Sequence, residues 1–95
     1  MYGTVARLRV KPDSKAKFLE VGRTQMAANI SGHVATYVYQ MDSDSNEFYL
    51  AVVFTSKEAY LANASSPEQN TRFEELMAVL DGPPEWHDGE VVSNS

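Results

Sequence analysis

The sequence predicts a single α+β domain in which one antiparallel sheet of four strands carries helices on one face. Ninety-five residues are enough for one domain of ordinary size and too few for two, so one domain over 1–95 is expected. Apolar residues alternate with period two in residues 2–10 and 33–41, and residues 47–54 form an apolar run of strand type after a polar turn. In the predicted helices, apolar residues recur at three- and four-residue steps. The resulting order is βαββαβ, without an internal repeat or a linker.

The first strand is predicted over residues 2–10 and the first helix over about 14–29. Alternation divides the strand between two faces, with Ala6, Leu8 and Val10 on one and Val5, Arg7 and Arg9 on the other. Residues 11–14 break the strand and offer Asp13 or Ser14 as the helix cap. The apolar helix positions that we expect to face the sheet are Ala16, Leu19, Gly22, Met26 and Ile30.

A β-hairpin follows, with strands over residues 33–41 and 47–54 and a polar turn over 42–46. In the first of these strands, Tyr37 and Tyr39 fall on the same face.

The hairpin turn partly matches a calcium-binding loop. Asp42, Asp44 and Asn46 occupy the first three odd ligand positions of an EF-hand. However, Glu47 stands where that loop requires glycine, and Val53 stands where it requires glutamate. No metal site is therefore predicted.

The second helix is predicted in two pieces, because two helix starts follow each other closely. Residues 55–58 and 66–69 both have the capping-box pattern, with Thr55 and Ser66 as the capping residues. Pro67 fits the first helical position of the second piece. An apolar stripe expected to pack on the sheet follows at Phe73, Leu76, Met77 and Leu80. Residues 81–84 end the helix, 85–92 form the last strand, and 93–95 form a flexible tail.

This order predicts a split βαβ, ferredoxin-like sheet with both helices on one face. The open face carries Val5, Arg7 and Arg9, and we expect Tyr37, Tyr39 and Tyr49 to join it. Because an exposed aromatic surface of this kind is usually covered by a partner, we expect a twofold homodimer formed through this open sheet face. Arg7 and Arg9 are expected to meet Asp88 or Glu90 of the last strand, in the same chain or in the partner.

Composition excludes several classes of protein. The fractions of hydrophobic and charged residues, 43% and 22%, are those of a soluble globular protein, and the longest apolar run, 50–54, cannot cross a bilayer. Zero cysteines rule out disulfides and thiolate sites, and with only two histidines a metal centre would have to rely on carboxylates. A net charge of −5 disfavours nucleic acid. The N-terminus has no export signal, so the cytoplasm is expected.

Two strings carry a resemblance to a known family. Residues 53–67 combine a strand, Ser-Lys-Glu-Ala and a break before Ser-Pro, and residues 84–90 read Pro-Glu-Trp-His-Asp-Gly-Glu. With the element order, they resemble the antibiotic biosynthesis monooxygenase family over nearly the whole chain. The resemblance implies a dimeric α+β barrel, with a pocket between the sheet and the helices of each subunit.

The resemblance also implies an activity. Characterised members oxidise aromatic phenols or quinols with oxygen and without a cofactor, whereas another branch degrades haem. The asparagine, tryptophan and histidine of the haem branch align with Ala6, Asn63 and Phe73, so haem degradation is not expected. Many quinol-oxidising relatives have histidine where Asn63 stands, although an asparagine can still orient a phenol by hydrogen bonding.

Three side chains are candidates for the chemistry. His87 has the side-chain type suited to taking a proton from a phenol, or else it is a strand-end histidine at the dimer interface. Asn63 and Arg72 lie at the break in the second helix, where a pocket mouth often forms. Arg72 could hold a phenolate, or pair with Glu68 or Glu75 on the helix surface.

Aromatic side chains are candidates for binding a substrate. Tyr60 and Phe73 line the mouth of the pocket or belong to the core. Trp86 stacks on an aromatic ligand or anchors the dimer, and Tyr37 is a phenolic donor or packs on the sheet. The remaining histidine, His33, is expected to face water.

The favoured function is a cofactor-independent monooxygenase acting on a small phenolic or quinol-like aromatic molecule. The alternative is a non-catalytic dimeric domain of the same fold that binds a small ligand or serves as an accessory protein. An RNA-binding module is disfavoured by the acidic charge. The feature that separates the first two is a proton acceptor beside a cavity of aromatic size.

Overall fold

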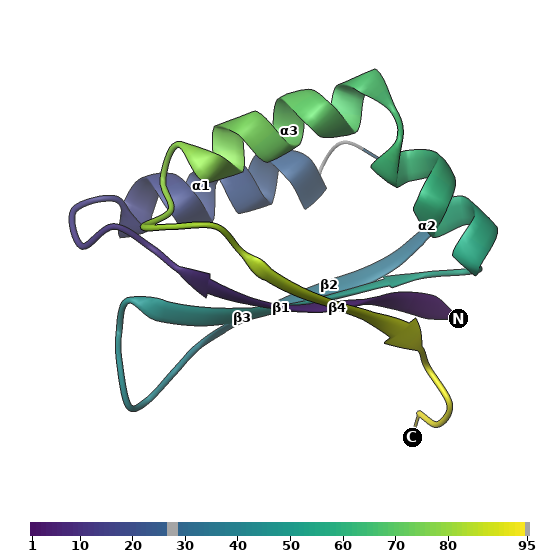
Figure 1. Cartoon of the computed structure of the whole chain (residues 1–95), viewed down its shortest axis with the longest axis horizontal. Helices are drawn as coiled ribbons and strands as arrows, with labels where there is room; N and C mark the ends of the chain where they lie inside the picture. The colour runs from purple at the N-terminus through teal and green to yellow at the C-terminus, as the bar shows by residue number, and fades with distance from the viewer. Residues whose placement is uncertain (27–28, 95) are drawn as a thin grey trace.

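A computed structural model describes residues 1–26 and 29–94 and confirms the predicted order of elements (Figure 1). The elements are β1 (Tyr2–Arg9), α1 (Lys15–Met26), β2 (His33–Gln40), β3 (Glu47–Phe54), α2 (Lys57–Ala64), α3 (Pro67–Met77) and β4 (Glu85–Glu90). The strands form one antiparallel sheet in the order β2-β3-β1-β4. This is the ferredoxin-like α+β fold. No helix within the described residues is long and apolar enough to span a bilayer.

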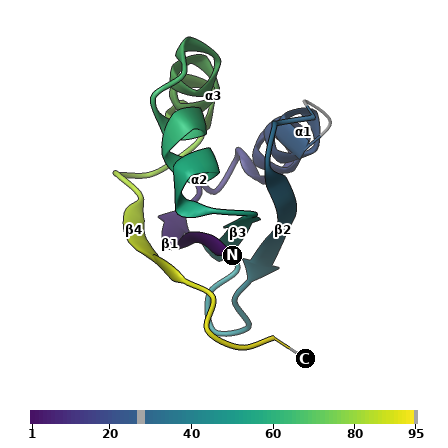
Figure 2. The same cartoon turned by 90° about the vertical axis from the view of Figure 1, so that its right-hand side faces the viewer.

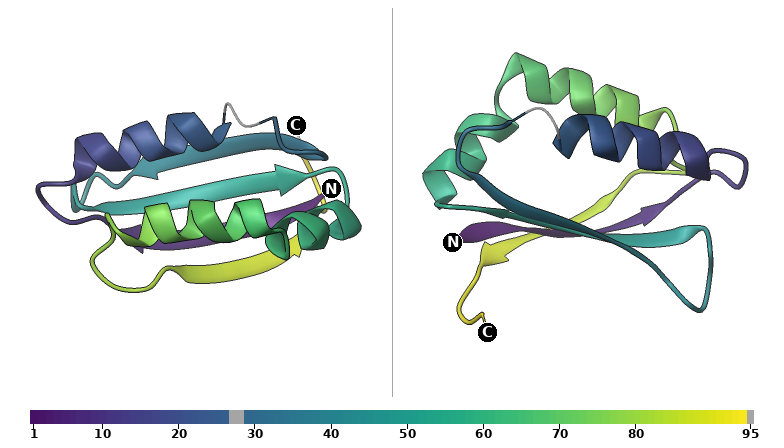
Figure 3. Two further views of the ribbon diagram at one scale, coloured as in Figure 1. Left: turned by 90° about the horizontal axis from the view of Figure 1, so that it is seen from above. Right: turned by 180° about the vertical axis from the view of Figure 1, so that it is seen from behind.

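The helices cover one face of the sheet and leave the other open. Figure 1 shows all three above the sheet, and Figure 2 shows α1 and α3 beside each other. Seen from above, α1 lies toward β2, α3 lies over the β1 side, and α2 sits at one end (Figure 3). The main core lies between these layers and contains Ala6, Leu8, Val10, Phe18, Phe48, Val79 and Leu80.

Several predicted boundaries extend past the elements that form, and the stripe residue Leu80 lies beyond α3, which ends at Met77. The first helix was expected to reach residue 29, but α1 ends at Met26, and 27–28 lie outside the described residues. The last strand was expected to reach residue 92, but β4 ends at Glu90. Beyond it the Val91 amide still donates to the Met1 carbonyl at 2.9 Å. The predicted tail ends in Ser95, which also lies outside the described residues.

The face of α1 that packs on the sheet differs from the predicted one. Phe18 and Val21 are buried, whereas Leu19 is 45% exposed and Ala16 is exposed too. The Phe18 ring packs on Phe48, with ring centroids 4.8 Å apart. This aromatic pair turns the start of the helix by about one residue, or 100°, from the predicted stripe, whereas the predicted positions Gly22 and Ile30 do line the space between the helices and the sheet.

The second helix breaks in two, as predicted. Ser66 caps α3 through a 3.1 Å hydrogen bond from the Gln69 amide, with Pro67 at the first turn. At α2 the prediction of Thr55 as the cap is wrong by one residue, because Ser56 accepts from the Ala59 amide. The Thr55 amide instead donates to the Gly32 carbonyl at 2.8 Å, which holds Thr55 to the loop before β2.

The open face has the predicted composition. The register places Arg7 opposite Tyr49, and Tyr49 opposite Tyr39, so these side chains lie on the same side of the sheet. Tyr37 and Tyr39 are 58% and 54% exposed, and Val5 is 48% exposed. A monomer thus leaves a row of aromatic side chains in water.

The ion pairs of the open face differ from those predicted. Arg7 contacts Glu47 at 3.0 Å and Glu85 at 3.9 Å, and not Asp88 or Glu90. The register explains the difference, since Arg7 pairs with Glu85 whereas Asp88 pairs with Thr4 on the helix-covered side.

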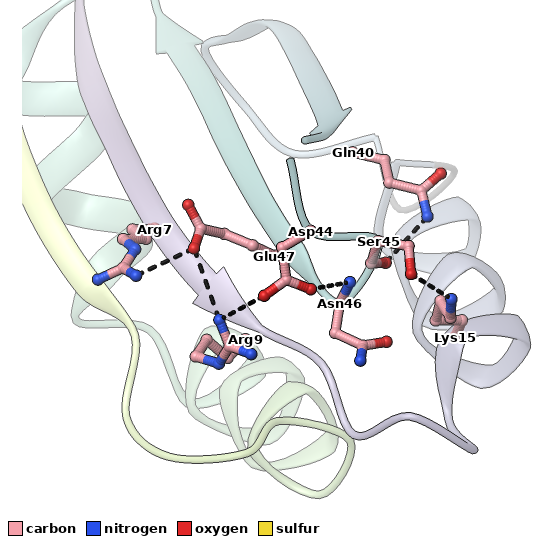
Figure 4. Close-up of polar contacts among 8 residues, drawn as sticks. All are labelled: Arg7, Arg9, Lys15, Gln40, Asp44, Ser45, Asn46 and Glu47. Carbon is pink, nitrogen blue, oxygen red and sulfur yellow. Dashed lines mark hydrogen bonds and ion pairs between the residues drawn. The ribbon is translucent and has the colours of Figure 1, made fainter. Parts of the chain in front are cut away.

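Arg9 continues the same network into the hairpin turn (Figure 4). It contacts Asp44 at 3.0 Å and Glu47 at 3.5 Å. The Asn46 amide donates to Asp44 at 2.9 Å, and this bond, with that from Arg9, lowers the pKa of the Asp44 carboxyl. The acidic turn is therefore neutralised by arginine and by backbone, and the described residues contain no cluster of metal-ligand type.

Candidate active site

A cavity of about 450 Å³ lies between the helices and the covered face of the sheet. This volume is within the range of small-molecule sites, about 300 to 1,000 Å³. Most of its wall is apolar, including Leu8, Phe18, Leu50, Phe54, Leu76 and Trp86. The space is therefore mostly apolar and large enough to hold a small molecule.

The sheet gives this cavity a floor made of cross-strand rows. Register pairs Asp88 with Thr4, Thr4 with Val52, and Val52 with Thr36, which makes one row across all four strands. The next row consists of Trp86, Ala6, Leu50 and Val38. A row with polar ends thus lies beside an apolar row, and both are part of the same face.

At the β4 side of the polar row, Tyr60 of α2 donates a 2.9 Å hydrogen bond to Asp88. The Tyr60 ring is fixed by edge contacts with Tyr2 and Phe54, at centroid distances of 5.3 and 5.7 Å. Burial, followed by the hydrogen bond to Asp88, raises the pKa of Tyr60 to about 12, although the nearby Thr4 hydroxyl acts in the opposite direction. Tyr60 is consequently a hydrogen-bond donor at neutral pH and not a base.

This pKa gives a direct prediction for an alkaline titration followed at 295 nm. One tyrosine should ionise near pH 12, and Asp88→Asn should bring that step closer to the ordinary value near 10. The unfolded chain ionises first, so the stability that Tyr60 contributes is complete below pH 10 and is lost as the pH rises toward 12. Tyr60→Phe should remove the late step, and a titration without any late step in the unmodified protein would contradict the assignment.

At the β2 side of the polar row, His33 lies half-buried against the cavity. Its Nε2 lies 2.6 Å from the Thr36 hydroxyl, and its ring meets the Phe54 ring edge-on at 5.7 Å. Two contacts therefore hold the imidazole in place. The expectation that His33 faces water is wrong, because the ring lies against Phe54 and lines the cavity.

A polar cluster lies where α2 breaks into α3. Arg72 donates from Nε to Gln69 Oε1 at 3.1 Å and from Nη2 to Asn63 Oδ1 at 3.0 Å. Asn63 Nδ2 in turn donates to Gln69 Oε1 at 3.2 Å. Arg72 is thus held by these two neutral side chains, and all three residues line the cavity.

The structure brings five of the seven predicted site residues to one cavity: Asn63, Arg72, Tyr60, Phe73 and Trp86. Phe73 and Trp86 lie beside each other, with ring centroids 6.5 Å apart, and Phe73 is 36% exposed instead of fully packed in the core. The stripe residues Leu76 and Met77 pack against the core as predicted, and Leu80 is part of it.

His87 and Tyr37 lie elsewhere. Val5 pairs with His87 and with Ala51, and Ala51 pairs with Tyr37, so both side chains are on the open face. His87 is exposed, with Nε2 at 3.0 Å from Glu85, and neither His87 nor Tyr37 lines the cavity. The thickness of the sheet separates them from Asn63 and Arg72.

The polar cavity residues that were not among the predicted ones include Thr4, His33, Gln69 and Asp88. Gln69 has a sequence signal, since it is part of the Ser66 capping box and lies three residues before Arg72. Asp88 also has a sequence signal. Side chains alternate along a strand, so Trp86 and Asp88 share one face, which is opposite to the face of His87.

Comparison with known proteins identifies the family. The family model described as "Antibiotic biosynthesis monooxygenase" matches residues 1–78. Comparison with curated proteins found no similar sequence.

Two solved structures illustrate the shared fold. The cofactor-independent oxygenase SnoaB from Streptomyces nogalater, solved in a mutant form, has a TM-score of 0.85 at 19% identity, covering 98% of this chain and 94% of its own. A conserved protein from Methanosarcina mazei Go1 has a TM-score of 0.80 at 18% identity, covering 93% and 89%. With the family match over most of its length, the chain belongs to the antibiotic biosynthesis monooxygenase family.

Proposed function

We propose that this protein is a cofactor-independent monooxygenase that acts on a phenolic or quinol-like aromatic molecule. The observation that carries the proposal is the cavity, in which an apolar space of about 450 Å³ meets two proton acceptors, His33 and Asp88. A domain that only binds an apolar ligand needs no such acceptor. The likeness to SnoaB, a cofactor-independent oxygenase, supports a reaction without a cofactor.

The reaction balances with oxygen as the only co-reactant. A naphthol and O₂ give a naphthoquinone and water. One oxygen atom becomes the new carbonyl oxygen on a ring carbon, and the other leaves as water with the two hydrogens lost from the ring carbon and the hydroxyl group. The ring supplies the electrons, and removal of the phenolic proton makes it electron-rich enough to react with oxygen.

The cavity residues fit distinct roles in this reaction. His33, oriented by Thr36, accepts the phenolic proton. Asn63 and Arg72 hold the phenolate or the reduced oxygen with charged and neutral donors. Phe73 and Trp86 form an aromatic wall for the ring system. His87 has no part in this assignment, because it lies on the opposite face of the sheet.

Oxygen uptake by the purified, metal-free protein tests the proposal. A small panel of anthrones, naphthols and quinols is compared with a buffer blank. We expect consumption of oxygen above the blank with at least one phenol, and formation of the corresponding quinone in equal amount. Uptake at the blank rate across the panel, together with tight binding of one of its members, would instead establish the binding-domain alternative.

We further propose that two copies pair through their open sheet faces. The exposed Val5, Tyr37 and Tyr39 supply an apolar surface, and the arginines beside them are neutralised within the chain. Covering this surface removes its apolar area from water, at about 25 cal/mol per Å².

The pairing predicts the mass in solution. Light scattering should give twice the 10.6 kDa of one chain. Val5→Asp places a carboxylate in the centre of the open face and should shift the mass toward one chain, whereas Val92→Asp, at a side chain that is 92% exposed in the tail, should not. A single-chain mass for the unmodified protein at all accessible concentrations would contradict the pairing.

A further inference from the structure

The strongest unexplained feature of the cavity is the Thr4 hydroxyl. Thr4 is 6% exposed, and its Oγ1 lies near the Tyr60 hydroxyl, whose pKa it lowers, but it makes no hydrogen bond of acceptable geometry among the described residues. A buried hydroxyl without a partner costs about 1 to 3 kcal/mol, so such groups generally have a role. Thr4 lines the cavity, but its Oγ1 is enclosed, so a bound molecule reaches this hydroxyl only when the Thr4 side chain rotates toward the cavity.

The neighbour of Thr4 on β4 is a carboxylate that can accept a second hydrogen bond. Asp88 lies directly across from Thr4 in the register, at the exposed edge strand, and lines the same cavity. Its Oδ1 accepts from Tyr60, and a carboxylate has acceptor sites beyond that one. The rings around Tyr60 fix this donor, and Tyr60 in turn positions the carboxylate.

The two groups together define the chemistry of a ligand atom. A carboxylate only accepts hydrogen bonds, whereas a threonine hydroxyl can donate one. The group that satisfies both is a hydroxyl, which donates to Asp88 and accepts from Thr4. A carbonyl or an ether oxygen cannot donate to Asp88, so it would leave the carboxylate without this bond.

The distance across the sheet adds a second constraint. The row that contains Asp88 and Thr4 ends on β2 at Thr36, which contacts His33. Three strand spacings, about 14 Å, separate Thr36 from Asp88, and two spacings, about 10 Å, separate Thr36 from Thr4. A ligand whose one hydroxyl lies near His33 therefore needs a second hydroxyl on the opposite side of a fused ring system to reach Thr4.

We propose that Thr4 and Asp88 bind a second hydroxyl group of the substrate, so that the preferred substrates are fused-ring aromatics with hydroxyl groups on opposite sides. This inference rests on the proposed function, since it assumes that the first hydroxyl is the one near His33. Thr4 and Asp88 are binding residues here, and Tyr60 is a positioning residue that acts through Asp88.

Anaerobic titration calorimetry tests this assignment with three probes: 2,6-dihydroxynaphthalene, its monomethyl ether 6-methoxy-2-naphthol, and 2-naphthol. The unmodified protein should bind the dihydroxy probe roughly tenfold tighter than either of the others, the amount expected for a hydrogen bond to a charged group. Asp88→Asn and Thr4→Val should each reduce this preference to less than about threefold, while the affinity for 2-naphthol changes little.

Two further variants separate hydrogen bonding from damage to the fold. Thr4→Ser keeps the hydroxyl and should keep the preference. Thr71→Val makes the same change as Thr4→Val on the exposed surface of α3, outside the cavity, and should also keep it.

The outcomes distinguish this inference from the proposed function. Equal affinity for the dihydroxy probe and its methyl ether, or a preference that survives both Asp88→Asn and Thr4→Val, would overturn the inference. Because binding is measured without oxygen, a protein that shows the preference but consumes no oxygen would refute the monooxygenase proposal and leave the hydroxyl site intact. Oxygen-dependent turnover of phenols without a preference for the dihydroxy probe would support the monooxygenase proposal and refute the hydroxyl site.

Discussion

His33→Ala is expected to lower kcat/KM for oxygen-dependent turnover of a naphthol by at least 100-fold, while His87→Ala changes it by less than twofold. A positioned general base typically contributes a factor of about 10² to 10⁴, and 100-fold corresponds to about 2.7 kcal/mol of transition-state stabilisation. The two variants remove the same side chain. One lines the cavity, and the other lies on the opposite face of the sheet.

Steady-state oxygen uptake measures both variants, and added imidazole distinguishes a missing base from a damaged fold. His33→Ala leaves a space beside Thr36 that free imidazole can enter, so imidazole should restore part of the activity of this variant alone. The loss should appear mainly in kcat, because the proton leaves during the chemical step. Full activity in His33→Ala, or an equal loss in His87→Ala, would remove His33 from the proposed mechanism.

Local patterns were sufficient to predict the elements and their order. The Ser66 cap and Pro67 act within one turn of α3, so sequence alone located the start of that helix. The Thr55 prediction failed by one residue because the Thr55 amide bonds to Gly32, a contact that the local pattern does not contain. The predicted face of α1 was partly wrong for a similar reason. The rotation of this helix follows from the contact between Phe18 and Phe48 of β3, which the local pattern does not contain either.

Which side chains reach the cavity is decided more by the pairing register of the strands than by residue type. Residue type alone cannot separate the two histidines, and the prediction of His87 as the base was made without the register, which puts adjacent strand residues on opposite faces. Trp86 pairs with Ala6 on the covered face, so His87 must face away from the cavity. His33 reaches the cavity through its contacts with Thr36 and Phe54, which strand pairing creates.

The cluster at the helix break was partly predictable. The position of Asn63 and Arg72 followed from the two helix starts, because a break exposes backbone and side chains at one place. The role of Gln69 as the acceptor for both did not follow, since Glu68 and Glu75 are charged and lie at helical spacing from Arg72.

Leu8→Ala is expected to lower the free energy of unfolding by about 3 to 5 kcal/mol, the upper part of the usual range for this change in a core. Leu8 is 1% exposed and packs in the main core, so its truncation removes buried apolar contacts. Leu8 also lines the cavity, and the space left by the side chain joins a volume that already exists. The surroundings therefore have little means of closing the gap by relaxation.

Urea denaturation measures this loss, and Leu61→Ala is the matched control. Leu61 is 50% exposed on α2, so the same truncation there should cost less than about 1 kcal/mol. Both variants are compared with the unmodified protein at one protein concentration, because pairing of two copies makes stability depend on concentration. An unchanged m-value would show that Leu8→Ala lowers stability without altering the extent of unfolding. Equal losses at Leu8 and Leu61 would mean that the layer between sheet and helices is not the main source of stability, contrary to the burial of Leu8.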